Sequence, residues 1–214
     1  MLVLASASPR RKELLRLVGI PFVVQPSDVD ESELPSPVPR ECAELLACQK
    51  ALAVWRTRPE DVVLGADTIV VVEETILGKP SDAEDAARML RLLSGRVHRV
   101  ITGVCVIGPV VSGQGSVASK PALCSTRSYS SHLVLENREL SAGSESTLVT
   151  MNELSGEEIW EYIRTGEPMD KAGAYAIQGL ASRWIPRIEG DYSNVVGLPV
   201  ALVYEMLRGR RGEG

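Results

Sequence analysis

The chain has 214 residues, of which 44% are hydrophobic, and its 28 Asp and Glu residues outnumber 23 Lys and Arg residues to give a net charge of -5. A chain of this size can bury a large core, and we expect one domain over residues 1–208 with a disordered tail at 209–214. The acidic balance argues against nucleic-acid and anionic membrane partners, so a site for a polyanion would have to be local.

Hydrophobic periodicity and capping signals predict an alternation of strands and helices. In chain order, the predicted elements are strand 2–5, a helix from 9 to a stop at 19, strand 22–24, helix 40–55, strands 62–64, 68–72 and 76–77, a helix from 81 to about 95, strand 99–107, a helix from 155 to 166, strands 174–177 and 184–188, and helix 199–207. Ser8 is the predicted N-cap of the first helix, and capping boxes at 81–84 and 155–158 open two others. The pattern predicts an α/β protein with a mixed, twisted sheet and flanking helices. The Ser-, Gly- and Pro-rich stretch 108–130 has no sustained period and is predicted to be a flexible loop.

The start of the chain and its cysteines predict a cytoplasmic protein. No apolar stretch approaches the roughly 20 residues that cross a bilayer, and residues 1–5 lack the charged start and long apolar core of a signal peptide. The four cysteines form no C-x-x-C pair, and the two histidines are too scattered for a zinc cluster. Reduced thiols are the simplest interpretation.

Basic residues crowd the start of the first predicted helix. Arg10, Arg11 and Lys12 follow the turn that contains Ser8, at a helix end that unpaired amides already make positive. Each cation there costs on the order of a few tenths of a kcal/mol, and a bound anion would reverse that penalty. The segment therefore fits a triphosphate cradle, and a solvated basic turn with surface salt bridges is the alternative.

Asp67 lies between apolar runs at 62–64 and 69–72. A carboxylate in such surroundings is costly to bury unless it is paired or holds a cation, so it is the best candidate for a metal ligand or general base. A turn aspartate that caps local amides is the alternative. Lys50 shares a helical face with apolar residues, where its ammonium either snorkels to the surface or meets an anion. Lys79 either reaches a phosphate from a tight turn or is an ordinary turn lysine.

Three further segments carry polar groups suited to a nucleotide. The stretch 166–173 combines turn residues with an adjacent acid and base, Asp170 and Lys171. Gln178 ends a predicted strand, and its amide can donate and accept at once, which matches the carbonyl and ring N–H of a pyrimidine. An ordinary strand-end amide is the alternative. The acidic loop around Glu31 either offers oxygen ligands for magnesium or is simply solvated.

Six segments, in the same order along the chain, resemble the Maf-like nucleotide pyrophosphatase family. They lie at 4–11, 65–70, 77–80, 98–104, 167–179 and 194–199. The resemblance implies an α/β fold with two lobes around a central nucleotide-binding cleft. It also implies a divalent cation, Mg²⁺ or Mn²⁺, and hydrolysis of nucleoside triphosphates to the monophosphate and pyrophosphate.

The family's functional positions correspond to individual residues of this chain. Its catalytic carboxylate, which also binds the metal, corresponds to Asp67, and a second acidic metal ligand corresponds to Glu31. The positions implied to select the substrate are Arg10, Thr68 and Gln178. The positions implied to bind phosphate are Ser8, Arg11, Lys50, Lys79 and Lys171.

The form of residues 175–179, Tyr-x-Ile-Gln-Gly, is similar to that of the family branch that acts on dTTP and UTP. A preference for 7-methyl-GTP, as in another branch, is one alternative. A non-catalytic nucleotide-binding regulator of cell division and a phosphatase that releases single phosphates are two more. The expected partner is a nucleoside triphosphate, and a homodimer is compatible with the sequence.

Overall fold

The computed structural model describes residues 1–29, 34–109, 128–135 and 138–208. Its strands are β1 (Leu2–Leu4), β2 (Val23–Val24), β3 (Val62–Val72), β4 (Thr75–Leu77), β5 (Val97–Pro109), β6 (Ser128–Leu135), β7 (Arg138–Thr150) and β8 (Arg187–Glu189). Its α-helices are α1 (Pro9–Leu17), α2 (Pro39–Trp55), α3 (Ala83–Leu93), α4 (Gly156–Arg164), α5 (Tyr192–Val196) and α6 (Val200–Arg208). Short 3₁₀ helices are η1 (Glu167–Asp170), η2 (Ala172–Ala174) and η3 (Leu180–Trp184). Within these residues, no helix combines the length and apolar composition needed to cross a bilayer.

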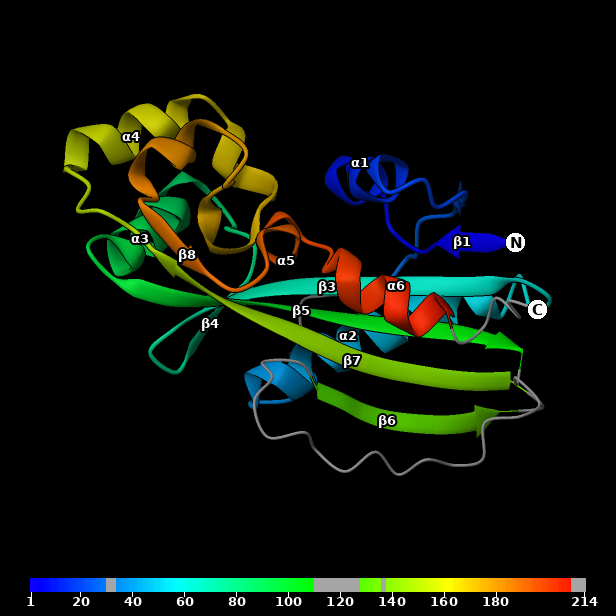
Figure 1. Ribbon diagram of the computed structural model, residues 1–214. Helices are drawn as coiled ribbons and strands as arrows, with labels where there is room; N and C mark the ends of the chain where they lie inside the picture. The colour runs from blue at the N-terminus through cyan, green and yellow to red at the C-terminus, as the bar shows by residue number, and fades with distance from the viewer. Residues whose placement is uncertain (30–33, 110–127, 136–137, 209–214) are drawn as a thin grey trace.

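The strands form one mixed sheet, as the sequence predicts. The strand order is β2-β1-β3-β5-β7-β6, with β4 added to β3 and β8 added to β7. β1 is parallel to β2 and β3, and all the other pairs are antiparallel. The long strands β3, β5 and β7 cross the whole molecule and carry the helices on both faces (Figure 1).

The helices divide between the two faces of the sheet because alternate residues of β3 point in opposite directions. Val63 and Val71 pack against α2, which lies alone behind the sheet in Figure 1. Leu64 packs with α1 and α6, whereas Val70 packs with α3 and α4. The face opposite α2 therefore carries two separate apolar clusters, and these form the two lobes.

Two glycines let α2 lie unusually close to the sheet. A Cβ added at Gly65 would overlap the carbonyl oxygen of Ala47, and one added at Gly103 would overlap that of Ala43. Because neither glycine has a side chain, the helix backbone can contact the strands directly. This close approach brings the middle of α2 against the middle of β3.

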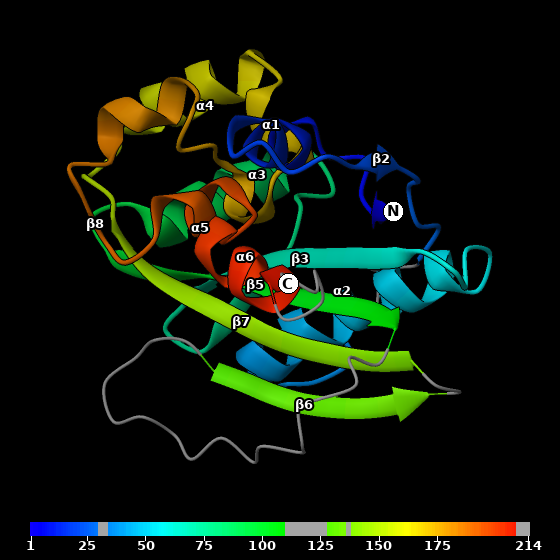
Figure 2. The ribbon, with the colours of Figure 1, turned by 45° about the vertical axis from the view of Figure 1, so that its right-hand side comes forward.

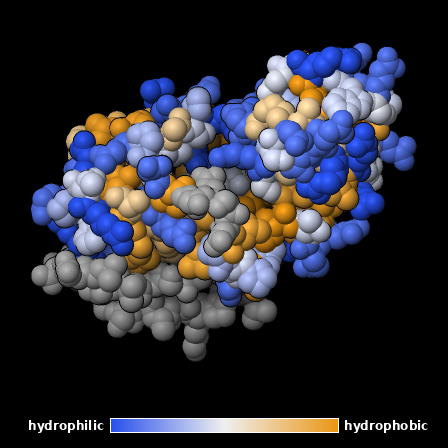
Figure 3. All heavy atoms as spheres, turned by 180° about the vertical axis from the view of Figure 1, so that it is seen from behind, coloured by the Kyte–Doolittle hydropathy of each residue, from blue (hydrophilic) through white to orange (hydrophobic). Residues whose placement is uncertain are grey.

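The edge of β3 is open at its centre. β1 pairs with its residues 62–64 and β4 with its residues 70–72, so within the described chain residues 65–69 have a strand partner only on the β5 side. The lobe with α1 lies on one side of this gap, and the lobe with α3 and α4 lies on the other (Figure 1). Figure 2 shows that both lobes stand on the same face of the sheet, above β3. Seen from behind, the upper parts of the two lobes stand apart, with hydrophilic residues at the top of the gap between them (Figure 3).

Two predicted segments differ from the structure near this gap. β3 runs unbroken through residues 65–67, where the sequence predicted a break, because Asp67 stays in register opposite Gly103 of β5. The predicted strand at 174–177 is wrong. Gly173 and Ala174 have φ angles of 68° and 58°, which turn the chain away from an extended path.

Other differences arise from polar strands and caps. The predicted loop 108–130 is too long at both ends, since β5 extends to Pro109 and β6 begins at Ser128, while 110–127 and 209–214 lie outside the described residues. β7 was not predicted, because it contains buried polar residues and has no clear apolar alternation. One of these residues is Ser144, whose hydroxyl donates to the carboxylate of Glu44. The capping box at 155–158 is confirmed, whereas Asp82 and not Ser81 caps α3.

Candidate active site

A cavity of about 720 Å³ lies at the open edge of β3, between the lobes. Every sequence-predicted site residue that the structure describes lines it, namely Ser8, Arg10, Arg11, Lys50, Asp67, Thr68, Lys79, Lys171 and Gln178. Glu31, the predicted second metal ligand, lies outside the described residues. Residues scattered over most of the chain therefore meet in one place.

The cavity is locally basic in an acidic protein. Its described lining contains five basic side chains, Arg10, Arg11, Lys50, Lys79 and Lys171. Only two acidic side chains, Asp67 and Asp170, are among the lining residues. A second hollow of about 820 Å³, between Val18 and Tyr204, has Glu145 and Asp191 in its lining and no described basic residue. A polyphosphate is therefore attracted to the first cavity and repelled from the second.

Asp67 and Lys50 form a buried ion pair at the back of the cavity. The Nζ atom of Lys50 donates to Oδ1 of Asp67 at 2.5 Å, and the two side chains are only 8% and 10% exposed. Asp67 therefore lies within a strand and not in a turn, and the ammonium of Lys50 meets an anion and does not snorkel to the surface. Asp67 lines the cavity, and no hydrogen bond to its second oxygen, Oδ2, is present among the described residues.

Arg11 is held rigidly on the wall beside Asp67. Its Nε donates to the carbonyl of Gly197 at 2.8 Å, Nη1 to Oγ of Ser6 at 3.1 Å, and Nη2 to Oγ1 of Thr68 at 3.0 Å. The planar fork of a guanidinium suits these three acceptors, and the side chain is buried. Arg11 therefore provides a fixed positive charge rather than a mobile surface cation.

A chain of hydrogen bonds fixes the hydroxyl of Thr68. The hydroxyl of Thr102 donates to the carbonyl of Asn194 at 3.1 Å, so the contact of 3.0 Å between the two threonine oxygens has Thr68 as its donor. The Asn194 side chain in turn donates to the carbonyl of Val100 and to Oγ1 of Thr147, both at 2.9 Å. Since Oγ1 of Thr68 already accepts from Arg11, the hydroxyl has one lone pair left and no free proton.

The N-terminus of α1 opens on the cavity as the sequence predicts. Ser8 is the N-cap, and its Oγ accepts from the Arg11 amide at 3.5 Å. Ser6 accepts from the Ser8 amide at 3.3 Å, which shapes the turn between β1 and α1. The helix end and its basic first turn thus face the same space as Asp67.

Lys171 is close to an acid of its own segment. Its Nζ donates to Oδ1 of Asp170 at 2.5 Å and to the carbonyl of Glu167 at 2.7 Å. Burial raises the pKa of Asp170, but the hydrogen bond and charge of Lys171, together with the charge of Arg10, outweigh it and leave the pKa below its ordinary value. Asp170 is therefore ionised and offsets part of the positive charge on this wall.

The remaining predicted residues lie at the rim. Lys79 follows β4 in an exposed turn, where the carbonyl of Gly78 accepts from the amide of Gly173 at 3.0 Å. Gln178 is also exposed, and no hydrogen bond of its side chain to a described residue is present. Both side chains are thus placed where a ligand in the cavity can meet them.

Comparison with known proteins gives the family. The model of the family described as Maf-like protein matches residues 1–210 of this chain. The chain belongs to the Maf-like family. The family that the six sequence segments predicted is therefore confirmed, and the mixed sheet with its flanking helices is consistent with a Maf-like fold.

Three curated relatives of this Maf-like protein are named dTTP/UTP pyrophosphatase. The relative from Koribacter versatilis is 50% identical over 207 residues, which cover 97% of this chain and 93% of the relative. The relative from Thermococcus gammatolerans is 47% identical over 206 residues, with coverage of 96% and 95%. The relative from Aquifex aeolicus is 40% identical over 206 residues, with coverage of 96% and 93%.

Several residues that support the Maf-like site were not singled out from the sequence. Thr102 and Asn194 lie in segments that carry the family resemblance, but their hydrogen bonds join elements far apart in the chain. Tyr162 reads as an ordinary apolar position of α4, and its hydroxyl contacts are visible only in three dimensions. The one available signal in the sequence was a polar residue directly before an apolar pair, as at Asn194, which the structure shows to be buried.

Proposed function

We propose that this Maf-like protein is a nucleoside triphosphate pyrophosphatase that hydrolyses dTTP and UTP to the monophosphate and pyrophosphate. The observation that carries the proposal is the buried carboxylate of Asp67 in a cavity lined by five basic side chains. Its support from sequence is the 50% identity, over 97% of the chain, to a dTTP/UTP pyrophosphatase. Modified pyrimidine nucleotides of the same shape are further candidate substrates.

Asp67 is the proposed general base. Asp67 lines the cavity, where its carboxylate can accept a proton from a water molecule, while Lys50 holds Oδ1 and fixes the carboxylate plane. As the water oxygen bonds to the α-phosphorus, the bond between that phosphorus and the oxygen that bridges to the β-phosphate breaks. The nucleoside monophosphate and pyrophosphate are then the two products, and one proton is released.

The basic side chains are proposed to stabilise the leaving pyrophosphate. Arg11 contributes a charge that is already fixed by three hydrogen bonds, so little reorganisation is needed during the reaction. Arg10, Lys79 and Lys171 lie on other walls of the same cavity, and the N-terminal turn at Ser8 adds amide donors. Negative charge that grows on the departing phosphates is thus met from several directions.

The donor set of the cavity fits a hard divalent cation that is shared with the substrate. Mg²⁺ in such sites takes one or two carboxylates and completes its shell with phosphate oxygens and water. Asp67 offers one oxygen, and no cluster of three metal-binding side chains occurs among the described residues. We propose that Asp67 and Glu31 hold Mg²⁺ or Mn²⁺, which would neutralise charge on the phosphoryl oxygens.

Base selection is assigned to three residues of the cavity lining. The amide of Gln178 can meet the carbonyl and ring N–H of thymine or uracil. Thr68 has one acceptor lone pair left, which suits a ring N–H, and Arg10 lies on the same lining. These three residues are the proposed determinants of pyrimidine preference.

The test is a product analysis on a panel of triphosphates with and without a chelator. We expect pyrophosphate, in equimolar amount with the monophosphate, to appear fastest from dTTP and UTP and to disappear when the metal is removed. Faster hydrolysis of 7-methyl-GTP would place the protein in another branch of activity. Release of orthophosphate alone would indicate a phosphatase, and binding without any product would indicate a nucleotide-binding regulator.

We further propose that residues 1–208 act as one domain in the cytoplasm. Cys42 and Cys48 are thiols outside any disulfide, which is the state that a reducing compartment maintains. A homodimer stays a prediction, which the molecular mass in solution would test.

A further inference from the structure

The segment that carries Gln178 is held by two side chains from outside it. The hydroxyl of Tyr162 accepts from the amide of Ala176 at 3.2 Å. The carboxylate of Glu167 accepts from the amide of Leu180, with Oε1 at 3.1 Å and Oε2 at 3.2 Å. The two anchored amides lie two residues before and two residues after Gln178.

The two anchoring side chains are themselves joined. The Tyr162 hydroxyl donates to Oε1 of Glu167 at 2.8 Å, so its oxygen remains the acceptor for Ala176. Burial, followed by the contact with Glu167, raises the pKa of Tyr162 above its usual value, which keeps the hydroxyl protonated and able to donate. One continuous chain of hydrogen bonds therefore runs from Ala176 through Tyr162 and Glu167 to Leu180.

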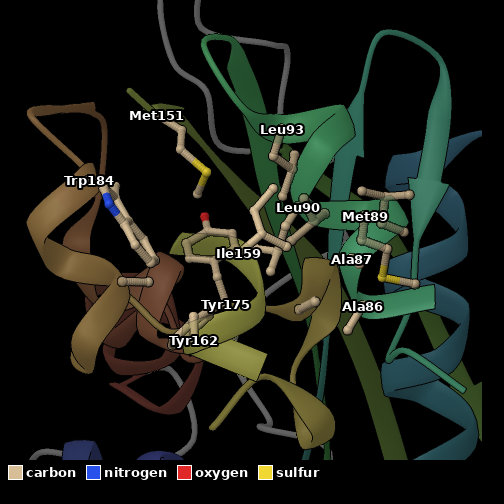
Figure 4. Packing of buried hydrophobic residues seen from close by; sticks show 14 of the residues in the cluster. Ala86, Ala87, Met89, Leu90, Leu93, Met151, Ile159, Tyr162, Tyr175 and Trp184 are labelled. Carbon is tan, nitrogen blue, oxygen red and sulfur yellow. The ribbon is translucent and has the colours of Figure 1, made fainter. Parts of the chain in front are cut away.

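Tyr162, one of the two anchoring side chains, is held rigidly by the packing around it. Tyr162 is 1% exposed and packs in the apolar cluster between α3 and α4, together with Ile159 and Trp184 (Figure 4). Its ring meets that of Trp184 edge to face, with centroids 5.4 Å apart. A side chain fixed in this way can hold its hydroxyl in one position without help from the solvent.

Gly179 allows the carboxylate to reach the segment. A Cβ at position 179 would overlap Oε1 of Glu167, so a side chain there would displace the carboxylate from its present position. The carboxylate thus lies directly against the backbone beside Gln178. In contrast, the Gln178 side chain itself is exposed on the cavity and has no hydrogen bond to a described residue.

We propose that Tyr162 and Glu167 are positioning residues that set recognition of the pyrimidine base by fixing the backbone of Gln178. Since the Gln178 amide is oriented by no described side chain, its place in the cavity depends on the backbone that carries it. Anchoring that backbone in advance removes an ordering cost from substrate binding. This inference rests on the proposed function and assigns to it two residues that do not line the cavity.

The test is a double-mutant cycle on dTTP hydrolysis. Tyr162→Phe, Glu167→Ala and Glu167→Gln are each made in the native chain and in a Gln178→Ala background, and kcat and KM are measured. In the native background, Tyr162→Phe and Glu167→Ala should each raise KM about five- to tenfold with a smaller change in kcat. This is the size of effect expected when one hydrogen bond to the backbone of the Gln178 segment is lost. In the Gln178→Ala background the same changes should alter KM less than about twofold, because coupled residues are not additive. Glu167→Gln keeps an acceptor and should restore most of the lost affinity.

Two measurements separate positioning from a general structural role. Competitive inhibition by pyrophosphate, which has no base, should stay within about twofold of native in every variant. Glu161→Ala on the exposed face of α4 and Tyr204→Phe on α6 are matched controls and should leave KM unchanged. Equal effects of Tyr162→Phe and Glu167→Ala in both backgrounds, or parallel loss of pyrophosphate inhibition, would overturn the inference. A native protein that does not hydrolyse dTTP would instead overturn the proposed function.

Discussion

The ammonium of Lys50 lies 2.5 Å from the carboxylate of Asp67, and the pair joins the helix α2 to the central strand of the sheet. The Asp67 side chain is only 10% exposed, so bulk water would solvate its charge poorly if Lys50 were removed. The same pair therefore stabilises the fold and orients the proposed general base.

Lys50→Met tests the structural half of this relationship. Removing one partner of a buried ion pair leaves an uncompensated charge, and we expect the free energy of unfolding to fall by about 3 kcal/mol. The double variant Lys50→Met, Asp67→Asn should recover part of that loss, since neither charge of the pair then remains. Urea unfolding of the native protein and the two variants measures this, and a Lys50→Met protein as stable as the native one would contradict the account.

Gly65→Ala tests the close approach of α2 to the sheet. The new methyl group would overlap the carbonyl of Ala47, so we expect α2 to be displaced and the free energy of unfolding to fall by about 2 kcal/mol or more. Activity should fall as well, because Lys50 on the same helix moves away from Asp67. Gly156→Ala is the matched control, since no atom lies within 4 Å of the added carbon there. A tolerated Gly65→Ala would show that the contact is not needed.

Arg11→Lys tests whether geometry matters beyond charge. A lysine keeps the positive charge, but it cannot donate to Gly197, Ser6 and Thr68 from one planar group. Loss of hydrogen bonds from a buried charged group predicts a free energy of unfolding lower by about 2 kcal/mol and a kcat/KM for dTTP lower by at least about tenfold. Arg16→Lys, on the exposed side of the same helix, should change neither quantity. Native kinetics in the Arg11→Lys protein would mean that only charge is used.

Because His98 is buried, we expect the free energy of unfolding to fall in mild acid. The Nε2 atom of His98 lies 2.7 Å from the hydroxyl of Tyr175, and burial lowers the pKa of His98 to about 4 from 6.5. The unfolded chain therefore binds a proton below pH 6.5 while the folded chain does not, so stability is full above pH 6.5 and falls as the pH drops toward 4. The shift corresponds to about 3 kcal/mol.

The measurement is the free energy of unfolding at several pH values between 7 and 4 for the native protein and for His98→Gln. Burial raises the pKa of Glu44, which acts in the opposite sense, so the difference between the two proteins is the informative quantity. That difference should shrink steadily as the pH falls. Parallel curves would mean that His98 is not the titrating group.

Local patterns in the sequence were sufficient to predict much of the site. A charge inside an apolar run marks Asp67, and a cation on an apolar helical face marks Lys50, because burying either group alone would be too costly. The N-terminus of α1 is equally local, since Ser8 and the following basic turn are adjacent in the chain. Such features can be predicted because their physical cause lies within one segment.

Features that depend on distant partners could not be predicted in this way. β7 is polar because its side chains are paired with α2 and α5, so its strand character cannot be recognised from hydrophobic alternation. The turn at Ala174 adopts a positive φ within what reads as a strand. Tyr162 anchors Ala176 only because the α4 lobe packs beside that segment. In each case the decisive contact crosses between elements, and the sequence carries no local trace of it.

The measurement that tests the central claim most directly is pyrophosphate release from dTTP by Asp67→Asn, with Mg²⁺ present. The amide has the size of the carboxylate but cannot accept the proton of water, so we predict a kcat lower by about 10²-fold or more in a protein that still folds and binds dTTP. An Asp67→Asn protein that releases pyrophosphate at close to the native rate would contradict the account.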